Sequence, residues 1–426
     1  MVYLALLASI VLFIFLTFKK ISPLLVAPIV TIFLALLTGM NPSQMLLEGY
    51  MGLAGNYVKS FFLIFLTGAV FAQIMHKTGA AAAIAKGIVN LVGEKWIIPA
   101  VVLSTAVLTY GGISLFIIFF VMYPMALTMH KEGNISKLLI PGEIALGAFT
   151  FTMTTPGSPQ VQNIIPTTFL GTPPTSAFIP GWIAGIAMAI LGILYLMRKA
   201  KKFEKQGIGF EAHDELEEKS EEKLPNFWLS IAPSIVVIVL LNISKINIVW
   251  SMVAGIILSI ILLWNRIKNV SGWLDILNTG AVSSTTVILN TAAIVGYAGA
   301  VQLLPQFPDI VEAVKSISIN DYYYPAVSTG LLSAVAASSS GGLSVAYSAL
   351  TESFLGLGIS MEVVHRVSSM AAGTIDSLPH CPAIINLITV TKTSHNDVYK
   401  DIAFLTIVIP LICVFLILVP LCMVMY

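Results

Sequence analysis

Residues 340–344 of this chain are Ser-Gly-Gly-Leu-Ser, and residues 110–114 are Tyr-Gly-Gly-Ile-Ser. A shift of 230 residues places the two glycines and the final serine of one stretch on those of the other. Both stretches interrupt strongly apolar sequence. Because glycine permits tight turns and lets the backbone approach a ligand closely, the pair predicts two similar turns inside two apolar segments.

A second pair of helix breakers follows the two glycine motifs. Residues 156–159 are Pro-Gly-Ser-Pro and residues 379–382 are Pro-His-Cys-Pro, and in each case an asparagine stands four positions after the second proline. Proline disrupts backbone hydrogen bonding inside a helix. Such breaks at membrane depth are tolerated where they are buried in protein or line a wet cavity. Paired, interrupted apolar segments in two halves of a chain are typical of the binding site of a secondary transporter.

The composition indicates a membrane protein. The chain is 57% hydrophobic and 10% charged, whereas soluble proteins have about 25% charged residues. Residues 1–18 lack a positive leader and a small-residue cleavage site, so we expect a retained first span and not a signal peptide. A bilayer-crossing helix needs about 20 apolar residues. The candidate spans are residues 1–18, 22–39, 57–75, 97–129, 138–170, 181–197, 226–243, 247–264, 280–303, 322–358, 361–391 and 402–425.

The distribution of Lys and Arg gives the expected orientation. With the N-terminus outside, most Lys and Arg residues fall on the cytoplasmic side, as the positive-inside rule requires. The charged segment 198–225 then forms a cytoplasmic linker between a first repeat, 1–197, and a second repeat of inverted topology, 226–426. Both termini lie outside a bacterial cytoplasmic (inner) membrane. The expected fold is an all-α polytopic membrane protein whose two inverted repeats each contain a re-entrant helical hairpin (about 97–129 and 322–358) and a broken transmembrane helix (about 138–170 and 361–391).

The hairpin tips and helix breaks together predict one polar pocket near the membrane midplane. The first N–H groups of each returning arm lack intrahelical partners and bear partial positive charge, which suits an anion. Serine is a favoured N-cap for such an arm, and its hydroxyl adds hydrogen-bonding capacity without a full charge. The predicted substrate-binding residues are Tyr110, Gly111, Gly112, Ser114, Thr155, Gly157, Ser158, Asn163, Ser338, Ser339, Ser340, Gly341, Gly342, Ser344, Ser377 and Asn386.

A packing role is the alternative for these motifs. Small-residue clusters also allow close approach of membrane helices, and prolines also simply kink helices. The recurrence of both motifs in both halves, next to polar residues, favours the binding site.

Ionisable residues inside spans are costly and are functional by default. Asp376 and His380 lie four residues apart across the second break, and we predict an ion-coupling role for both. Histidine can carry a coupling proton near neutral pH; alternatively, Asp376 with backbone carbonyls could ligate sodium. Glu143 and Arg366 occupy equivalent positions at a shift of 223 residues, and a structural ion pair or a functional role is open for Arg366.

The block of residues 365–380, His-Arg-Val-Ser-Ser-Met-Ala-Ala-Gly-Thr-Ile-Asp-Ser-Leu-Pro-His, resembles the gluconate permease family, the gluconate:proton symporters of the ion transporter superfamily. It is most similar to the 3-hydroxybutyrate-permease-like branch, as is the following stretch 391–401. The resemblance implies inverted repeats and uptake of small hydroxy-carboxylates, usually with protons. It also implies a homodimer in which a transport domain moves against a scaffold.

The leading functional prediction is a symporter that imports a small hydroxy-monocarboxylate such as 3-hydroxybutyrate or gluconate with protons, by elevator-type alternating access. Sodium-coupled symport of dicarboxylates or other organic acids is the alternative, and an anion channel is a weaker one. No nucleophile–base set, nucleotide loop or metal-ligand spacing is present, so neither an enzyme nor a cofactor or metal is expected. The net charge of +1 argues against nucleic acid as a partner.

Overall fold

The computed structural model describes residues 2–19, 21–93, 96–113, 115–210, 224–309, 312, 319–336, 338–379 and 381–426. The regular structure in these ranges is helical, without a strand. Five segments within them are long and apolar enough to cross a membrane: Pro42–Lys77, Phe178–Lys205, Ile248–Arg266, Val270–Gln302 and His395–Met425. The prediction of an all-α polytopic membrane protein is confirmed.

The first half of the chain begins with two short apolar helices and a long composite one. Ser22 begins the second helix by accepting the N–H of Leu24 (3.3 Å), and Gly39, with φ 71°, ends it. The helices of this half are α1 (Val2–Phe18), α2 (Pro23–Thr38), α3 (Pro42–Gln44) continuing through the π-helical η1 (Met45–Tyr50) into α4 (Met51–Lys77), α5 (Ala80–Val92), α6 (Ile97–Tyr110), α7 (Leu115–Glu132), η3 (Lys137–Leu139), α8 (Ile140–Phe149), α9 (Phe151–Thr154), α10 (Val161–Leu170) and α11 (Phe178–Lys205).

The second half repeats the order of two apolar helices, one long helix, a hairpin and a broken helix. Asn226, Asn247 and Asn269 cap its first three helices through their side-chain oxygens, as favoured N-cap residues do. The helices are α12 (Phe227–Asn242), α13 (Ile248–Leu263), η4 (Trp264–Arg266), α14 (Val270–Gln302), α16 (Tyr324–Ala336), α17 (Ser339–Leu355), α18 (Met361–Ala372), α19 (Pro382–Val390), α20 (His395–Ala403), η5 (Phe404–Val408), α21 (Ile409–Cys413), η6 (Val414–Leu418) and α22 (Val419–Met425).

The first glycine motif and both proline motifs interrupt helices where the sequence predicts, whereas Gly341 and Gly342 of the second glycine motif lie inside α17, whose N-cap is Ser338. The α6–α7 hairpin turns through Gly112, whose φ of 91° is a conformation that side chains disfavour. In the α16–α17 hairpin, Ser338 caps α17 by accepting the N–H of Gly341 (3.2 Å). Residues 155–160 separate α9 from α10, and residues 373–381 separate α18 from α19.

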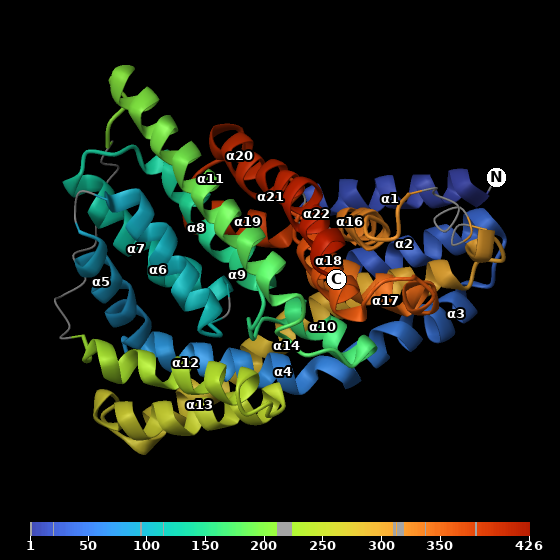
Figure 1. The fold of residues 1–426 in the computed structure, drawn as a ribbon. Coiled ribbons are helices and arrows are strands. Elements are labelled where there is room, and N and C mark those ends of the chain that lie inside the picture. The colour runs from blue at the N-terminus through green and yellow to red at the C-terminus, as the bar shows by residue number, and fades with distance from the viewer. Residues whose placement is uncertain are drawn as a thin grey trace.

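The long helices α4 and α14 form the most extensive helix pair in the described part of the molecule. Their packing is reciprocal, because α2 lies on α14 and α13 lies on α4. In Figure 1 the hairpin α6–α7 and α5 lie at the left, whereas α1, α2 and α16 lie at the right. Helices α11 and α20–α22 pack together along the upper side.

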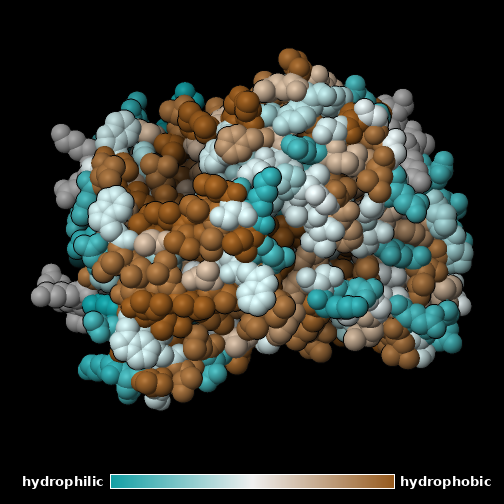
Figure 2. All heavy atoms as spheres, turned by 60° about the horizontal axis from the view of Figure 1, so that its bottom comes forward, coloured by the Kyte–Doolittle hydropathy of each residue, from teal (hydrophilic) through white to brown (hydrophobic). Residues whose placement is uncertain are grey.

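Large apolar side chains cover the outside of the molecule. On α12 and α13, for example, Trp228, Trp250 and Ile261 are each about two-thirds exposed or more. Figure 2 shows a wide hydrophobic field on the left part of this face, with hydrophilic residues along the left and right margins. Such a contiguous apolar surface is unfavourable in water and is the expected surface toward lipid.

Several bounds differ from the predicted spans. Helix α5 was not predicted, because at 13 residues it is too short to cross a bilayer. Helix α14 begins ten residues before the predicted start at 280, because its first turns are polar. Helix α11 continues to Lys205, past the predicted repeat boundary at 197, and linker residues 211–223 lie outside the described part of the chain.

Candidate functional site

A cavity of about 470 Å³ lies where the second hairpin tip, the two helix breaks, α4 and α14 meet. Its polar wall comes from short side chains at the interruptions and from one face of α14. An apolar patch of α4 closes the other side, at Ile64, Phe65, Gly68 and Ala69. The polar residues that line the cavity are Gln160, Gln162, Ser283, Ser284, Thr286, Asn290, Thr291, Ser338, Ser339, Ser340, Asp376, Ser377 and Asn386.

Asp376 belongs to the break between α18 and α19, and its carboxylate lies beside the start of α17. The backbone N–H of Ser339 donates to Asp376 Oδ2 (3.2 Å), and the hydroxyl of Ser377 donates to Oδ1 (3.1 Å). Asp376 is 9% exposed and is the only acidic or basic side chain among the described residues that line the cavity. The helix start that the sequence assigns to a substrate anion therefore holds an internal carboxylate.

Gln162 connects the break of the first half to the hairpin tip of the second half. Its Nε2 donates to Ser339 Oγ (3.2 Å), and its backbone carbonyl accepts from Ser369 Oγ (2.9 Å). Gln162 is 5% exposed, and its Oε1 is buried without a hydrogen-bond partner. A buried polar atom without a partner is rare in proteins, so Oε1 is available to a donor that enters the cavity.

The first hairpin tip reaches the cavity through Gly112 and Leu115. Gln160, two residues before Gln162, fixes this tip to the first break. Its Nε2 donates to the carbonyls of Thr109 (2.6 Å) and Ile113 (3.3 Å). The interrupted elements of both halves therefore meet at one cavity.

Sequence reasoning missed Gln160, Gln162 and the contribution of α14. The signal for α14 is the spacing of Ser283, Val287, Asn290 and Ile294, which recur every three or four residues and so share one helix face. The sequence feature that indicates the glutamines is the presence of two amide side chains between helix-breaking prolines in an apolar segment.

The structure brings six of the sixteen predicted substrate-binding residues to the cavity and places nine others elsewhere. The six are Gly112, Ser338, Ser339, Ser340, Ser377 and Asn386, and Asp376 joins them. Gly341, Gly342 and Ser344 lie in the first turns of α17, where Ser344 Oγ donates to the carbonyl of Ser340 (2.9 Å). Ser114 and His380 lie outside the described residues, and the binding roles of the whole set stay predictions.

The remaining predicted residues of the first half bond to protein behind the cavity wall. The hydroxyl of Tyr110 donates to the carbonyl of Pro156 (2.8 Å), and the carbonyl of Gly157 accepts from Asn242 Nδ2 (2.8 Å). These contacts hold the loop of the first break against α6 and α12. The other residues of this group are Gly111, Thr155, Ser158 and Asn163, all buried. The hydroxyl of Thr155 has no hydrogen-bond partner among the described residues.

A sequence model of the GntP family permeases matches residues 1–270, which is more than half of the chain. The chain belongs to the GntP permease family. The family that residues 365–380 indicate is thereby confirmed, through a match to a different part of the chain.

Relatives of this GntP permease are transporters. The uncharacterized transporter YxjC of Bacillus subtilis (strain 168) is 35% identical over 444 residues, which cover 92% of this chain and 93% of YxjC. An uncharacterized transporter of Haemophilus influenzae is 22% identical over 323 residues, 74% of each protein. The crystal structure of the YdaH transporter of Alcanivorax borkumensis shares the fold, with a TM-score of 0.58 and 12% identity over 87% of this chain and 86% of that one. The GntP permease is therefore a secondary transporter and not an enzyme.

Arg366 of this GntP permease is fully buried away from the cavity and fixes the first break to α18. Its Nε donates to the carbonyl of Ser176 (3.0 Å), Nη2 to that of Pro174 (2.9 Å) and Nη1 to that of Thr154. Nη1 also donates to Asn163 Oδ1 (2.8 Å). The guanidinium thus binds oxygens from both sides of the interruption in the first half.

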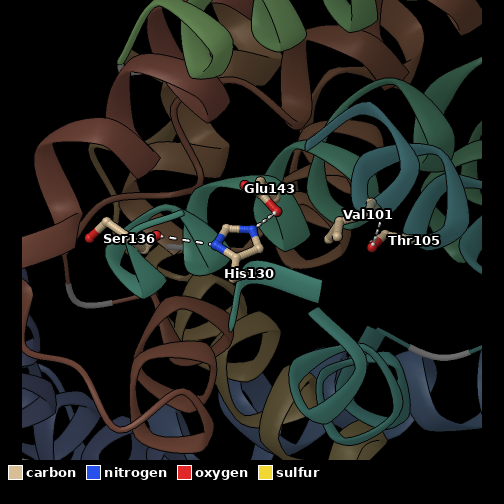
Figure 3. A network of polar contacts seen from close by, with 5 residues as sticks. All are labelled: Val101, Thr105, His130, Ser136 and Glu143. Carbon is tan, nitrogen blue, oxygen red and sulfur yellow. Dashed lines mark hydrogen bonds and ion pairs between the residues drawn. The ribbon is translucent and has the colours of Figure 1, made fainter. Parts of the chain in front are cut away.

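Glu143, at the position equivalent to Arg366, pairs with a different residue. Its Oε2 lies 3.0 Å from His130 Nε2, and His130 Nδ1 lies 3.2 Å from the carbonyl of Ser136 (Figure 3). Both side chains are fully buried. This pair joins the end of α7 to the start of α8, so the ion pair that the sequence left open for Arg366 is not formed with Glu143.

A second ion pair joins the last helices of the two halves. Asp401 Oδ1 of α20 accepts from Lys199 Nζ (2.9 Å) and from the hydroxyl of Tyr195 (2.5 Å), both on α11. Asp401 is 5% exposed. The contact holds α11 and α20 together away from the cavity.

Proposed function

We propose that this GntP permease imports a small hydroxy-monocarboxylate, such as 3-hydroxybutyrate or gluconate, by proton symport. The observation that supports this most is the position of Asp376, a buried carboxylate inside the cavity at the start of α17. A carboxylate that binds and releases a proton where the substrate binds can couple the two, because an uncompensated buried charge is costly.

The lining of the cavity supports a monocarboxylate. Its size, about 470 Å³, falls in the range of small-molecule sites. Hydroxyls and amides supply hydrogen bonds, but no Lys, Arg or His is among the described lining residues. A second carboxylate would therefore enter without a basic partner.

Elevator-type movement of two inverted repeats, 1–197 and 226–426, is part of the proposal. The same element order in both halves and the reciprocal packing of α2 on α14 and α13 on α4 support the repeats. We assign the hairpins, the broken helices, α11 and α20–α22 to a moving transport part. The remaining scaffold consists of α1, α2, α4, α12, α13 and α14, by which the protein forms a homodimer.

The proposed location is the bacterial cytoplasmic (inner) membrane. Both termini face outside and the linker 198–225 faces the cytoplasm. The asymmetric distribution of Lys and Arg supports this orientation.

Sodium coupling is the second candidate. The carboxylate of Asp376 and the neighbouring hydroxyl of Ser377 (3.1 Å) are oxygen ligands of the kind that hard cations prefer. A sodium-coupled carrier of dicarboxylates or other acids would use the same cavity.

Uptake into proteoliposomes separates these candidates. Labelled 3-hydroxybutyrate, gluconate and a dicarboxylate are offered under an imposed proton gradient, an imposed sodium gradient, or neither. Accumulation of a hydroxy-monocarboxylate driven by protons alone is expected. Uptake that depends on sodium would contradict proton symport, and rapid non-saturating flux without a gradient would indicate a channel.

Ser339→Ala and Ser340→Ala test the hairpin tip. Each removes a cavity hydroxyl, and hydrogen bonds to charged groups contribute about 1.5–3 kcal/mol, so KM should rise by about tenfold or more. Ser328→Ala is the matched control, because Ser328 is buried in the same hairpin and donates to the carbonyl of Tyr324 (2.7 Å) away from the cavity. Unchanged KM in both tip variants would remove the tip from the site.

A further inference from the structure

We propose that Asp376 is an internal substitute for the substrate carboxylate, so that substrate binds at the start of α17 only when Asp376 is protonated and has left it. The proposal rests on the proposed carboxylate transport and adds the order of events at the same site. It also assigns a second substrate contact, from the substrate hydroxyl to Gln162.

The first observation is that the start of α17 already holds a carboxylate. Ser339 N–H, in the first turn of this 17-residue helix, donates to Asp376 Oδ2 at 3.2 Å. Amide groups at a helix start stabilise one nearby anion. A substrate carboxylate that uses the same amide must displace Asp376.

The second, independent observation is Gln162. Its Nε2 donates to the hydroxyl of Ser339 (3.2 Å), which links the first break to the hairpin tip. Its Oε1 remains buried without a partner at the cavity wall. An orphaned acceptor fits a hydroxyl donor. A hydroxy acid therefore satisfies two features at once, with its carboxylate on α17 and its hydroxyl on Gln162.

The absence of other charged side chains in the described lining around Asp376 fixes the ratio of bound substrate anions to bound protons at one to one. The facing walls from α4, α14 and the first half add no acidic or basic side chain among the described lining residues. Two carboxylates together without a cation would repel. Binding of one substrate anion therefore requires one proton on Asp376.

Three other titratable side chains, a thiol and two phenols, lie near Asp376 in the described part of the chain. The thiol of Cys381 lies in the same break and lines the cavity, and the hydroxyl of Tyr399 on α20 donates to the carbonyl of Ser377 (3.1 Å). Tyr57 of α4 is buried near Ser340. His380 lies outside the described residues, so the experiment must identify Asp376 directly.

The direct test measures proton uptake by the wild-type protein. Purified permease in weakly buffered detergent at pH 7.5 receives 3-hydroxybutyrate, and an indicator dye reports the protons taken up while a radioligand assay reports the bound anion. One proton for each bound anion is expected. Binding without proton uptake would overturn the proposal even if proton-driven transport in proteoliposomes stands.

Asp376→Asn is the matching variant, because an amide resembles the protonated acid. In the wild type, Kd for 3-hydroxybutyrate should rise about tenfold per pH unit once Asp376 is ionised. In the variant, Kd should not change with pH, and counterflow should persist while proton-driven accumulation is lost. Asp401→Asn, which removes a buried carboxylate away from the cavity, should keep the wild-type pH dependence.

Gln162→Leu tests the second contact. Its Kd for 3-hydroxybutyrate should rise about tenfold, whereas its Kd for butyrate, which lacks the hydroxyl, should stay within about twofold of the wild-type value. An equal loss for both ligands would overturn the role of Gln162.

A Kd of Asp376→Asn that still rises with pH would overturn the role of Asp376, whereas a wild type that transports no hydroxy acid would overturn the proposed function itself.

Discussion

Arg366 is the largest side chain that the described structure buries completely, and its hydrogen bonds explain why the charge is tolerated inside a membrane protein. Its donors bind four oxygens of the first break and its loop, including the amide of Asn163. Carbonyl oxygens at an interrupted helix have lost their own partners. The guanidinium supplies several donors in one plane, so a single residue of the second half bonds to the carbonyls of Thr154 and Ser176. The carbonyl of Pro174 also accepts from the N–H of Gly157 and from Asn163 Nδ2.

We expect Arg366→Lys to destabilise the protein by about 3 kcal/mol. Lysine keeps the positive charge but cannot reach all four oxygens, and each buried group left without a partner costs about 1–3 kcal/mol. The loss should appear as a lower melting temperature in detergent, measured by fluorescence-detected size exclusion. Arg198→Lys is the control, because Arg198 is exposed near the end of α11. Equal melting temperatures for the two variants would contradict this role.

Polar and charged residues inside apolar sequence could be predicted as candidates for the site. The direction in which each side chain points could not be predicted. Asp376 is a charge inside a span, and it does lie at the cavity. Asn163 is equally conspicuous in the sequence, but the structure places it beneath Arg366. Around a helix break the backbone direction changes within a few residues, so spacing no longer tells which side chains share a face.

At the scale of the element, the helix interruptions were predictable because their causes are local. Proline and glycine act through sterics and missing hydrogen bonds at their own positions. The polar face of α14 was not predicted, because its hydroxyls lower the hydropathy of the segment without breaking the helix. Helix α5 was missed for a different reason, since its 13 residues fall below the length of a span.

Close packing between the arms of the second hairpin predicts the effect of Gly342→Ala. A Cβ at Gly342 would lie 2.1 Å from Ser333 Oγ and 2.3 Å from Ser333 Cα, so α16 and α17 would have to separate. Overpacking of this kind costs about 1–3 kcal/mol, and both melting temperature and uptake should fall.

The matched control is Gly55→Ala in α4. No atom lies within 4 Å of a Cβ at Gly55, and alanine favours a helix over glycine by about 1 kcal/mol. This variant should be as stable as the wild type or slightly more stable. A stable and fully active Gly342→Ala variant would mean that the hairpin arms are not held this tightly.

At the scale of the whole molecule, the sequence indicates the proposed repeat only through two matching offsets, and it does not indicate the pairing of α4 with α14. Contacts between distant helices depend on the shapes of entire faces, which short motifs do not encode. The ion pair of Lys199 with Asp401 likewise joins the two halves through residues that show no pattern in the sequence.

A disulfide between the proposed moving part and the scaffold should stop transport. A Cβ at Gly111, at the first hairpin tip, would lie 3.1 Å from Cβ of Ser234 on α12, slightly below the range of about 3.5–4.5 Å in disulfides, so a small shift of the tip admits the bond. Oxidised Gly111→Cys/Ser234→Cys protein should lose uptake and regain it after reduction. The three native cysteines are buried and should not interfere.

The control disulfide lies inside the proposed moving part. A Cβ at Gly185 of α11 would lie 3.8 Å from Cβ of Thr155. Oxidised Gly185→Cys/Thr155→Cys protein should transport at the same rate as the reduced form of the same variant. Full uptake by the oxidised Gly111→Cys/Ser234→Cys protein would exclude movement of the hairpin against α12.

The single carboxylate in the described cavity lining has a consequence for the energy source of the carrier. If the ionised Asp376 occupies the empty site, and the substrate anion beside a neutral Asp376 occupies the loaded one, both forms bear the same charge across the bilayer. The membrane voltage then does no work on either crossing. Under this condition the carrier is electroneutral, and the pH difference alone limits how far it concentrates its substrate.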